Sequence, residues 1–253
     1  MDINELRAMI DEIDAEILKL FERRMEASKK IGEYKKEKNL PLYDEQREIA
    51  LLQSRAKMMK NDSLDPYVKQ LFKTIMQLSK GYQFQTVTDK NIVLIGMMGS
   101  GKTSKGRLLA ERLGMAFSDI DTEIEKDAGM TISEIFEMHG KFKFREMESK
   151  KIEELSSLSR HVISTGGGVV LSDSNMTKLK KNGIVVFINR NIDEIVRTID
   201  TKKRPLLAKG AHALYAIYNE RLPLYKRWSD YEITDEDKSV EDSVDDLIKT
   251  IFR

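Results

Sequence analysis

The sequence predicts two domains: an all-α domain of three helices at residues 1–88 and an α/β domain with a parallel sheet at residues 89–253. Three observations support this division. Residues 1–85 follow a helical apolar periodicity and carry no strand signal. After residue 90, short apolar runs alternate with helical patterns, which is typical of a parallel sheet covered by helices on both faces. A glycine-rich turn directly follows the first of these runs.

The first helix is expected over residues 4–38, and its apolar residues recur every seven positions. They form two series: Ile3, Ile10, Ile17 and Ile31, and Leu6, Ile13, Leu20 and Ala27. Arg24 occupies a position of the first series where an apolar residue is expected. Arg7 and Lys35 are four heptads apart and therefore share one edge of the helix. At 1.5 Å per residue, they lie about 40 Å apart along it.

A second helix is expected over residues 44–60, and a third follows Asp65 and Pro66, which suit a cap and a first turn. Polar residues interrupt the apolar faces of these two helices: Asp44, Arg47 and Glu48 in the second, and Ser79 and Gln83 in the third. A buried cation is costly unless it is paired, so several basic groups facing a helical core indicate an anion-binding pocket. The alternative is a charge-rich helical hairpin that only dimerises.

In this order, the residues resemble the all-helical chorismate mutase family over essentially the whole segment. The motifs that carry the resemblance are Leu6-Arg7, Ile13-Asp14, Arg23-Arg24, Ile31-Gly32, Tyr34-Lys35, Pro41-Leu42-Tyr43-Asp44, Arg47-Glu48, Ser79 and Gln83. The resemblance implies that Arg7, Arg24 and Arg47 contact the carboxylates of chorismate. It also implies that Lys35 and Gln83 are catalytic and face the ether oxygen of the substrate. Asp44, Glu48 and Ser79 would hold the hydroxyl group and the nearby backbone.

The implied reaction is the rearrangement of chorismate to prephenate, which needs no nucleophile and no general base. It needs a folded substrate and stabilisation of negative charge on the ether oxygen, and arginine binds carboxylates bidentately. Because no small substrate can touch both Arg7 and Lys35 of one chain, we expect an intertwined homodimer in which Arg7 reaches into the partner's pocket. A helical module that binds an effector or dimerises without turnover is the alternative.

The glycine-rich turn is Gly96-Met97-Met98-Gly99-Ser100-Gly101-Lys102-Thr103, the P-loop pattern G-x-x-x-x-G-K-[ST] between an apolar strand and a helix. Its backbone N–H groups are expected to converge on phosphate oxygens at the helix N-terminus. Lys102 would reach the β- and γ-phosphates, and the Thr103 hydroxyl would ligate Mg²⁺. A flexible turn without a ligand is the alternative. A GTPase switch would also carry an Asn-Lys-x-Asp motif, which this sequence lacks.

The other strands are expected at residues 117–119, 161–165, 183–188 and 231–234, and further motifs lie at the ends of the first two. In parallel sheets, ligands bind at the carboxyl ends of the strands. Asp119 and Asp121 suit Mg²⁺ and ligand hydroxyl groups at such an end, or they cap the next helix. Three glycines at residues 166–168 bring bare backbone close to a small ligand, or form a turn. The basic segment 201–207, which contains Pro205, suits a mobile lid.

Over nearly all of residues 91–253, these motifs resemble shikimate kinase. The series is Asp-x-Asp, Phe-Arg-x-x-Glu, Gly-Gly-Gly, Arg-Pro-Leu-Leu and Glu-Arg-x-Pro-Leu-Tyr. The resemblance implies an ATP site made of Gly99, Ser100, Gly101, Lys102, Thr103, Ser104, Arg197 and Arg204. It implies a shikimate site made of Asp121, Arg145, Gly167, Gly168 and Arg221. It implies metal ligands at Thr103 and Asp119.

The resemblance also implies roles for these residues. Asp121 would orient the acceptor hydroxyl and help to deprotonate it, and it would be catalytic together with Lys102 and Arg204, the arginine of the lid. Arg145 and Arg221 would clamp the carboxylate of shikimate, Gly167 and Gly168 would contact its ring hydroxyls through backbone, and Arg197 would stack on adenine. One departure is Lys141, where the family is expected to carry glutamate.

Composition limits the remaining alternatives. The chain has 43 Lys and Arg residues against 42 Asp and Glu residues, so its net charge of +1 indicates neither a nucleic-acid nor a membrane partner. The absence of cysteine excludes disulfides, cysteine nucleophiles and thiolate zinc sites. The N-terminus lacks a signal-peptide pattern, and the longest apolar runs are too short to span a bilayer. We therefore expect a cytoplasmic enzyme, and a kinase for another polyol, such as gluconate, is the alternative for the second domain.

Overall fold

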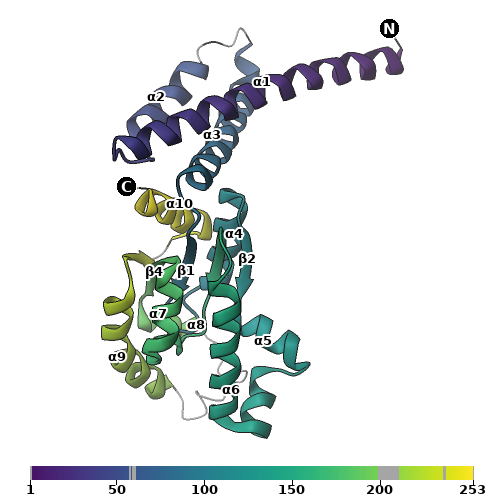
Figure 1. Cartoon of the computed structure of the whole chain (residues 1–253). Coiled ribbons are helices and arrows are strands. Elements are labelled where there is room, and N and C mark those ends of the chain that lie inside the picture. Colours follow the sequence, from purple (N-terminus) through teal and green to yellow (C-terminus); the bar gives the residue numbers. More distant parts are fainter. Residues whose placement is uncertain (1, 57, 59–60, 199–210, 236–237, 253) are drawn as a thin grey trace. The chain divides into compact units, whose positions relative to one another are not determined.

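The computed structural model of the chain describes residues 2–56, 58, 61–198, 211–235 and 238–252. The chain forms two compact units (Figure 1). The helical unit consists of the residues up to Thr88 together with Phe252, and the P-loop unit consists of Asp89–Ile251. Phe252, which is predicted in the second domain, therefore groups with the first. Within the described residues, no helix is both long enough and apolar enough to cross a membrane.

Three long helices build the helical unit: α1 (Ile3–Glu37), α2 (Glu45–Ala56) and α3 (Asp65–Val87), with a short 3-10 turn η1 (Asp62–Leu64) before α3. The helix α1 begins at a capping box, in which the Asp2 side chain accepts hydrogen bonds from the backbone N–H groups of Asn4 and Glu5. Both α1 and α2 pack against α3. The three predicted helices are therefore confirmed.

The helix α3 continues through residues 81–87 and ends at Val87. Phe84 lies in this last part of the helix, is only 3% exposed and stacks on Phe252 of the same unit with 4.9 Å between ring centroids. Packing of this aromatic ring stabilises two further helical turns that local sequence does not favour.

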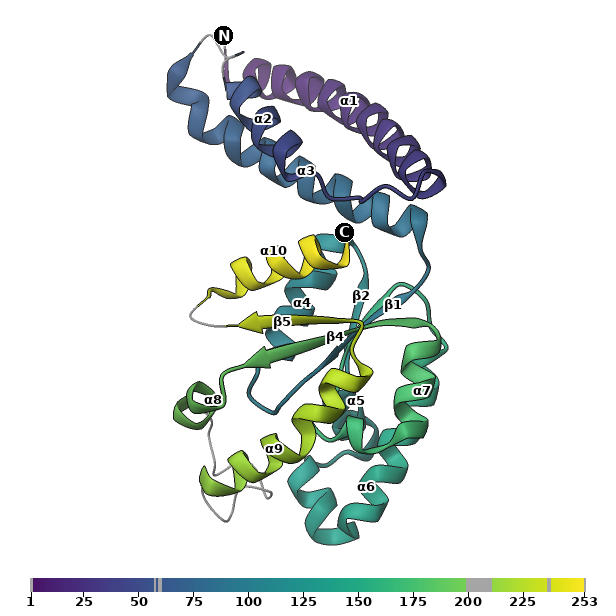
Figure 2. The same ribbon diagram turned by 90° about the vertical axis from the view of Figure 1, so that its left-hand side faces the viewer.

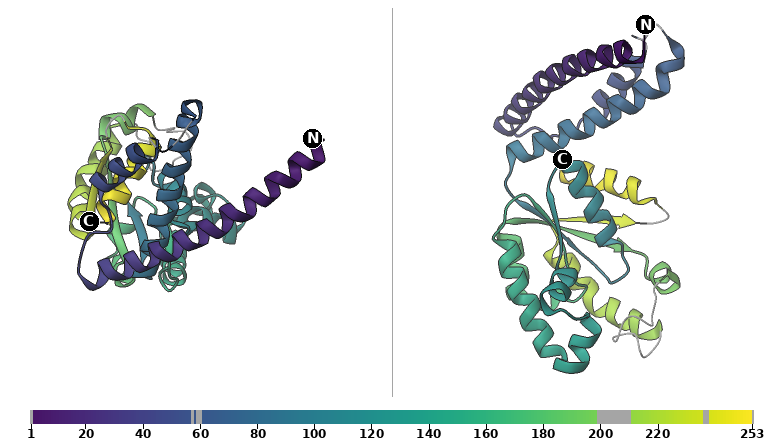
Figure 3. Two further views of the ribbon diagram at one scale, coloured as in Figure 1. Left: turned by 90° about the horizontal axis from the view of Figure 1, so that it is seen from above. Right: turned by 90° about the vertical axis from the view of Figure 1, so that its right-hand side faces the viewer.

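The N-terminal part of α1 projects beyond α2 and α3, whereas its C-terminal part lies against α3 (Figures 1 and 3). The heptad residues on this part are largely exposed: Ile10, Ile13, Ile17 and Leu20 are 50–60% exposed. An amphipathic helix normally buries its apolar stripe against a partner. This stripe is therefore an apolar surface that a single chain leaves uncovered.

A sheet of five parallel strands forms the centre of the P-loop unit (Figure 2). The strands are β1 (Asn91–Ile95), β2 (Ala116–Asp119), β3 (His161–Ser164), β4 (Gly183–Arg190) and β5 (Tyr231–Asp235), in the order β2-β3-β1-β4-β5. The central strand β1 is buried along its whole length, as a near-continuous apolar run in a covered parallel sheet should be. The predicted α/β fold with a parallel sheet is confirmed.

Helices cover both faces of this sheet (Figure 2). They are α4 (Lys102–Leu113), α5 (Ile120–Ala128), α6 (Ile132–Ser156), α7 (Asp173–Lys181), α8 (Ile192–Thr198), α9 (Ala211–Trp228) and α10 (Val240–Ile251), with a 3-10 turn η2 (Val169–Leu171) before α7. The helices α4 and α10 pack together on one face, and α7 and α9 contact β4 on the other. Gly140 interrupts α6 with a φ of +75°.

We expect Gly183→Ala to destabilise the P-loop unit. A Cβ atom at this residue would lie 2.4 Å from the Leu179 carbonyl oxygen and 2.8 Å from Val93 Cγ2. Overpacking against backbone that cannot move aside costs about 3 kcal/mol. Unfolding in urea, followed by the fluorescence of Trp228, measures the loss, because this single tryptophan packs against the core of the P-loop unit.

Gly129→Ala is the matched control for this experiment. A Cβ atom at Gly129 would meet no atom within 4 Å, so only the strain of its φ of +65° remains, which is roughly 1–2 kcal/mol. Equal unfolding midpoints for the two variants would contradict the packing argument.

Candidate functional site

The P-loop connects β1 to α4 as the motif predicts. Gly96 and Gly101 adopt φ values of +147° and +82°, which glycine adopts without steric cost. A Cβ atom at Gly96 would also lie 2.6 Å from the carbonyl oxygen of Ile188. Lys102 begins α4, and its Nζ donates hydrogen bonds to the carbonyl oxygens of Gly96 and Met97 at 2.9 and 2.7 Å. The ammonium group therefore lies against the loop that is predicted to bind phosphate.

Ser100 supplies an independent test of whether the loop fits a nucleotide. Its side chain is fully buried, and its hydroxyl oxygen has no hydrogen-bond partner within the described part of the chain. The hydroxyl lies inside the loop, since a Cβ atom at Gly96 would be 3.2 Å from Ser100 Oγ. Buried hydroxyl groups are normally hydrogen-bonded. This one fits an additional acceptor in the loop, such as a phosphate oxygen of ATP.

Thr103 and Asp119 form the candidate metal site. The Thr103 hydroxyl donates a hydrogen bond of 2.7 Å to Asp119 Oδ2. The other carboxylate oxygen, Oδ1, accepts from the backbone N–H groups of Asp121 and Thr122 and so caps α5. The two interpretations of Asp119 are therefore compatible, because each uses a different oxygen. A hydroxyl and a carboxylate are the oxygen ligands that Mg²⁺ prefers, and substrate phosphates and water usually complete its shell.

Two arginines meet the glycine run that follows β3. Arg145 of α6 lies so close to Gly168 that a Cβ atom at this glycine would clash with its guanidinium group. Arg221 of α9 is 6% exposed, and its Nη1 donates a hydrogen bond of 2.9 Å to the carbonyl oxygen of Gly167. The glycines thus let two guanidinium groups, from helices distant in sequence, approach the same stretch of backbone.

Two carboxylates approach the first glycine of the same run. A Cβ atom at Gly166 would lie 2.7 Å from Asp121 Oδ1 and 3.3 Å from Glu148 Oε1. Glu148 is 1% exposed, and its Oε2 pairs with Arg145 Nη1 at 2.5 Å. Burial raises the pKa of Glu148, and the positive charges of Arg145 and Arg221 oppose this shift. The predicted shikimate residues of α5, α6 and α9 therefore converge at the carboxyl end of β3.

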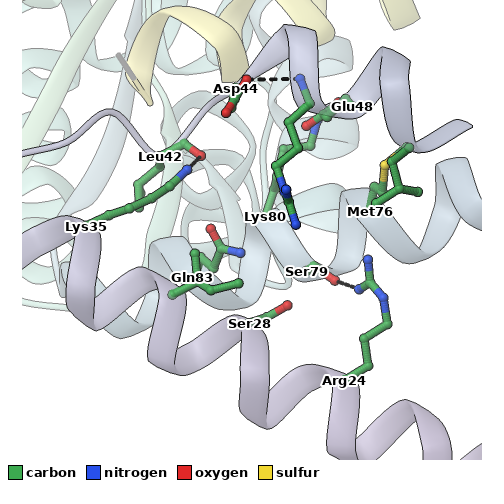
Figure 4. Close-up of a pocket in the computed structure, with 13 residues that line it drawn as sticks. Arg24, Ser28, Lys35, Leu42, Asp44, Glu48, Met76, Ser79, Lys80 and Gln83 are labelled. Carbon is green, nitrogen blue, oxygen red and sulfur yellow. Dashed lines mark hydrogen bonds and ion pairs between the residues drawn. The ribbon is translucent and has the colours of Figure 1, made fainter. Parts of the chain in front are cut away.

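The helical unit contains a cavity of about 180 Å³ between α1, α2 and α3 (Figure 4). Its lining includes seven of the eight residues predicted to bind chorismate: Arg24, Lys35, Asp44, Arg47, Glu48, Ser79 and Gln83. Figure 4 shows Arg24 and Lys35 of α1 on one side of the cavity and Asp44 and Glu48 on the other. Ser79 and Gln83 of α3 lie between them.

The charge of this pocket is unbalanced. Four cationic side chains line it, namely Arg24, Lys35, Arg47 and Lys80, against the two carboxylates of Asp44 and Glu48. Lys80 pairs with Glu48 at 3.1 Å, and its ammonium lies 5.1 Å from the centre of the Tyr43 ring. An excess of two positive charges remains, which matches a ligand with two carboxylates.

Two of these cations, Arg24 and Lys35, are partly buried. Arg24 Nη1 donates hydrogen bonds to the Ser79 hydroxyl and to the Ile75 carbonyl oxygen, and Lys35 Nζ donates one of 2.8 Å to the Leu42 carbonyl oxygen. Burial lowers the pKa of both side chains. The shift in Arg24 is increased by nearby Arg55. A bound anion would reverse these shifts by favouring the charged forms.

The second unit is similar to known shikimate kinases. The family model for shikimate kinase matches residues 98–252, which is more than half of the chain. The chain belongs to the shikimate kinase family. It is 42% identical to the shikimate kinase of Caldanaerobacter subterraneus subsp. tengcongensis over 65% of this chain and 97% of the relative. It is 48% identical to that of Caldicellulosiruptor bescii over 57% of this chain and 85% of the relative.

Solved structures agree with this assignment. The shikimate kinase from Acinetobacter baumannii, in complex with shikimate, matches with a TM-score of 0.62 and 38% identity over 64% of this chain and 92% of that chain. The shikimate kinase from Aquifex aeolicus matches with a TM-score of 0.58 and 33% identity over 64% of this chain and 95% of that chain. In the helical unit, residues 6–84 match the family model for chorismate mutase type II. Both family resemblances are confirmed.

Two predicted residues of the kinase site, Ser104 and Arg197, stand apart from the clusters described above. Ser104 is exposed in the first turn of α4, and Arg197 is exposed near the end of α8. Arg204 lies outside the described residues. Lys141, the departure from the family pattern, is exposed directly after the break at Gly140.

Arg7 is the predicted mutase residue that does not line the pocket. It is exposed near the beginning of α1, and 17 residues separate it from Arg24, which corresponds to about 26 Å along the helix. An arginine side chain cannot cover this distance. Its assignment as a substrate contact therefore requires a second chain and stays a prediction.

Three residues without a predicted role also lie in these sites. Lys80 lines the mutase pocket, Glu148 pairs with Arg145, and the Tyr225 hydroxyl donates a hydrogen bond of 2.5 Å to the Gly167 carbonyl oxygen. Burial raises the pKa of Tyr225 to about 12, so the hydroxyl keeps its proton at neutral pH. Glu148 is the last residue of the Phe-Arg-x-x-Glu motif, and Tyr225 is the last residue of the Glu-Arg-x-Pro-Leu-Tyr motif. Their spacing from Arg145 and Arg221 is therefore the sequence signal that points to these two residues.

Proposed function

We propose that this chain is a bifunctional enzyme of aromatic amino acid biosynthesis. The P-loop unit transfers the γ-phosphoryl group of ATP to the 3-hydroxyl of shikimate, and the helical unit rearranges chorismate to prephenate. The observation that carries the proposal is that the residues predicted for each substrate converge within a separate unit. The pocket that contains Lys35 and Gln83 favours turnover of chorismate over the alternative of effector binding without catalysis.

In the kinase reaction, the chain mainly positions its substrates and neutralises charge. Arg145 and Arg221 hold the carboxylate of shikimate, which directs the acceptor hydroxyl toward Asp121. Asp121 orients this hydroxyl and accepts its proton as the phosphoryl group is transferred. Lys102 turns from the loop carbonyl groups to the phosphates and compensates their negative charge. Bound Mg²⁺, which Thr103 and Asp119 would hold, supplies further compensation of the phosphate charge.

In the mutase reaction, the pocket selects the reactive conformer of chorismate. Arg24 and Arg47 bind carboxylates, which holds the two ends of the substrate in position. Lys35 and Gln83 donate hydrogen bonds to the ether oxygen, on which negative charge develops as the carbon–oxygen bond breaks. Glu48, held by Lys80, accepts from the substrate hydroxyl. No protein group needs to gain or lose a proton.

We further propose that the active mutase is a homodimer formed through α1. The exposed apolar stripe of α1 needs a partner, and a second copy of the same stripe supplies one of matching chemistry. The same arrangement would bring Arg7 of one chain to the pocket of the other. Because ATP is consumed in the reaction, we place the enzyme in the cytoplasm, where ATP is abundant.

Reciprocal substitutions test the two-site proposal. Lys102→Ala should remove ATP-dependent phosphorylation of shikimate and leave chorismate consumption within about twofold, since the sites share no residue. Lys35→Ala should do the opposite. Both activities are measured on each purified protein, by ATP consumption with shikimate and by chorismate loss without ATP. If a folded variant loses both activities, the division into two independent sites is wrong.

Arg145→Ala should raise KM for shikimate by about tenfold or more and leave KM for ATP nearly unchanged. The reason is the loss of a charge-assisted contact to the substrate carboxylate, worth about 1.5–3 kcal/mol. Because this variant also leaves Glu148 buried without its ion pair, Glu148→Gln in the same background is the control that restores neutrality. Equal increases in the two KM values would contradict the role of Arg145.

The pH profile of the mutase reports on Lys35. Burial lowers the pKa of Lys35, Arg47 adds to this shift, and Asp44 and Glu48 partly offset it. The Lys35 amine must be protonated to stabilise the negative charge on the ether oxygen. Therefore kcat/KM should fall as the pH rises through this lowered pKa. A bound dicarboxylate favours the ammonium, so kcat should fall only at higher pH. Lys35→Arg, whose guanidinium stays charged, should remove the alkaline decline from whatever activity remains; an unchanged decline would exclude Lys35 as its source.

Subunit exchange tests the composite pocket. Arg7→Ala and Arg24→Ala proteins should each be inactive as mutases. In a mixed dimer, one pocket carries both substitutions and the other carries neither. Random pairing makes half of the dimers mixed, so about a quarter of wild-type activity should return. If mass measurements confirm exchange and no activity returns, Arg7 does not act in its partner's pocket.

A further inference from the structure

Two cations outside the P-loop motif bind the carbonyl groups of the loop. Lys105, three residues after Lys102 on α4, donates a hydrogen bond of 3.1 Å from Nζ to the Ser100 carbonyl oxygen. Arg190, at the end of β4, donates one of 3.1 Å from Nη1 to the Gly99 carbonyl oxygen. Consecutive carbonyl groups of the loop are thus held by cations from two different elements.

The burial of Lys105 needs an explanation. Lys105 is only 5% exposed, on the buried face of α4 that also carries Leu109 and Leu113. Removing an ammonium group from water is costly unless it gains strong interactions. Gly101 makes room for it, because a Cβ atom at that residue would lie 2.6 Å from Lys105 Nζ. The glycine of the motif and this lysine therefore fit each other.

The planarity of the peptide group gives these contacts a consequence for the ligand. In a trans peptide, the C=O and N–H groups point in opposite directions. With the Ser100 carbonyl held toward Lys105, the Gly101 N–H points away from Lys105. In the neighbouring peptide, the Gly99 carbonyl is held by Arg190 while the Ser100 N–H closes a turn to the Met97 carbonyl oxygen at 3.2 Å. The two cations thus fix the orientation of both peptides.

Arg190 also connects the loop to α8. Its Nε pairs with Glu194 of this helix at 3.2 Å, and both side chains are mostly buried. The helix α8 carries Arg197, which is predicted to contact adenine. One guanidinium group therefore joins the phosphate end of the nucleotide site to the helix at its adenine end.

Resting on the kinase function proposed above, we propose that Lys105 and Arg190 are positioning residues for ATP. They hold the Ser100 and Gly99 carbonyl groups toward themselves, so that the Gly101 N–H is presented to the phosphates. They also neutralise carbonyl dipoles that would otherwise repel phosphate. Neither residue needs to touch the nucleotide. The effect falls on the nucleotide and leaves the shikimate site, built by α5, α6 and α9, unchanged.

Substitution by methionine tests this proposal, since it removes the charge and retains a long side chain. In Lys105→Met and in Arg190→Met, KM for ATP should rise by about tenfold, with KM for shikimate and kcat within about twofold. Arg190→Lys should recover part of the loss. Arg107→Met is the matched control, because Arg107 lies exposed on the same helix and loses the same charge; it should leave KM for ATP unchanged.

Two further measurements keep the result decisive. Calorimetric titration with ADP and Mg²⁺ compares nucleotide affinity independently of phosphoryl transfer, and should show the same loss of about tenfold. Trp228 fluorescence in urea shows whether each variant is folded. If Lys105→Met does not fold, the nucleotide affinity of Arg190→Met tests the proposal. Unchanged nucleotide affinity in a folded variant overturns the proposal, as does an equal rise in KM for ATP and for shikimate.

Discussion

The central position of β1 is the constraint on which the P-loop unit depends. Its four apolar residues from Ile92 to Ile95 are fully buried between β3 and β4. The carboxyl end of a central strand opens onto the middle of the sheet edge, with neighbours on both sides. Leu94 accepts hydrogen bonds from both the backbone and the side chain of Thr165, which ties the end of β1 to the start of the glycine run. The P-loop and the glycine run at residues 166–168 are adjacent for this reason, although some 70 residues separate them.

We propose that the two units bind anions by different physical means. In the helical pocket, the positive charge comes from side chains on three helices, and the lowered pKa values of Arg24 and Lys35 record the cost of partly burying them. In the P-loop unit, backbone N–H groups supply much of the attraction, and lysine and arginine side chains shape the loop that presents them. A dicarboxylate of fixed shape suits the first arrangement, whereas a flexible phosphate chain suits the second.

Sequence was sufficient for the features that depend on local pattern. The heptads of α1, the apolar run of β1 and the glycines of the P-loop each determine their own structure, and the order of the motifs identified both families. The extension of α3 to Val87 could not be predicted, because it depends on the burial of Phe84 among residues distant in sequence. Lys80 and Lys105 were missed for the same reason. A lysine on a helix is usually exposed, and only tertiary packing shows that these two lie within a pocket and beneath a loop.

The exposed stripe of α1 has a consequence for how the two activities depend on the amount of protein. With the composite pocket that we propose, a mutase site exists only when two chains associate, whereas each chain carries a whole kinase site. At concentrations below the dissociation constant of the dimer, mutase activity would grow with the square of the chain concentration and kinase activity in direct proportion. The ratio of the two fluxes would then rise with expression level, although the fusion fixes the two domains at equal numbers.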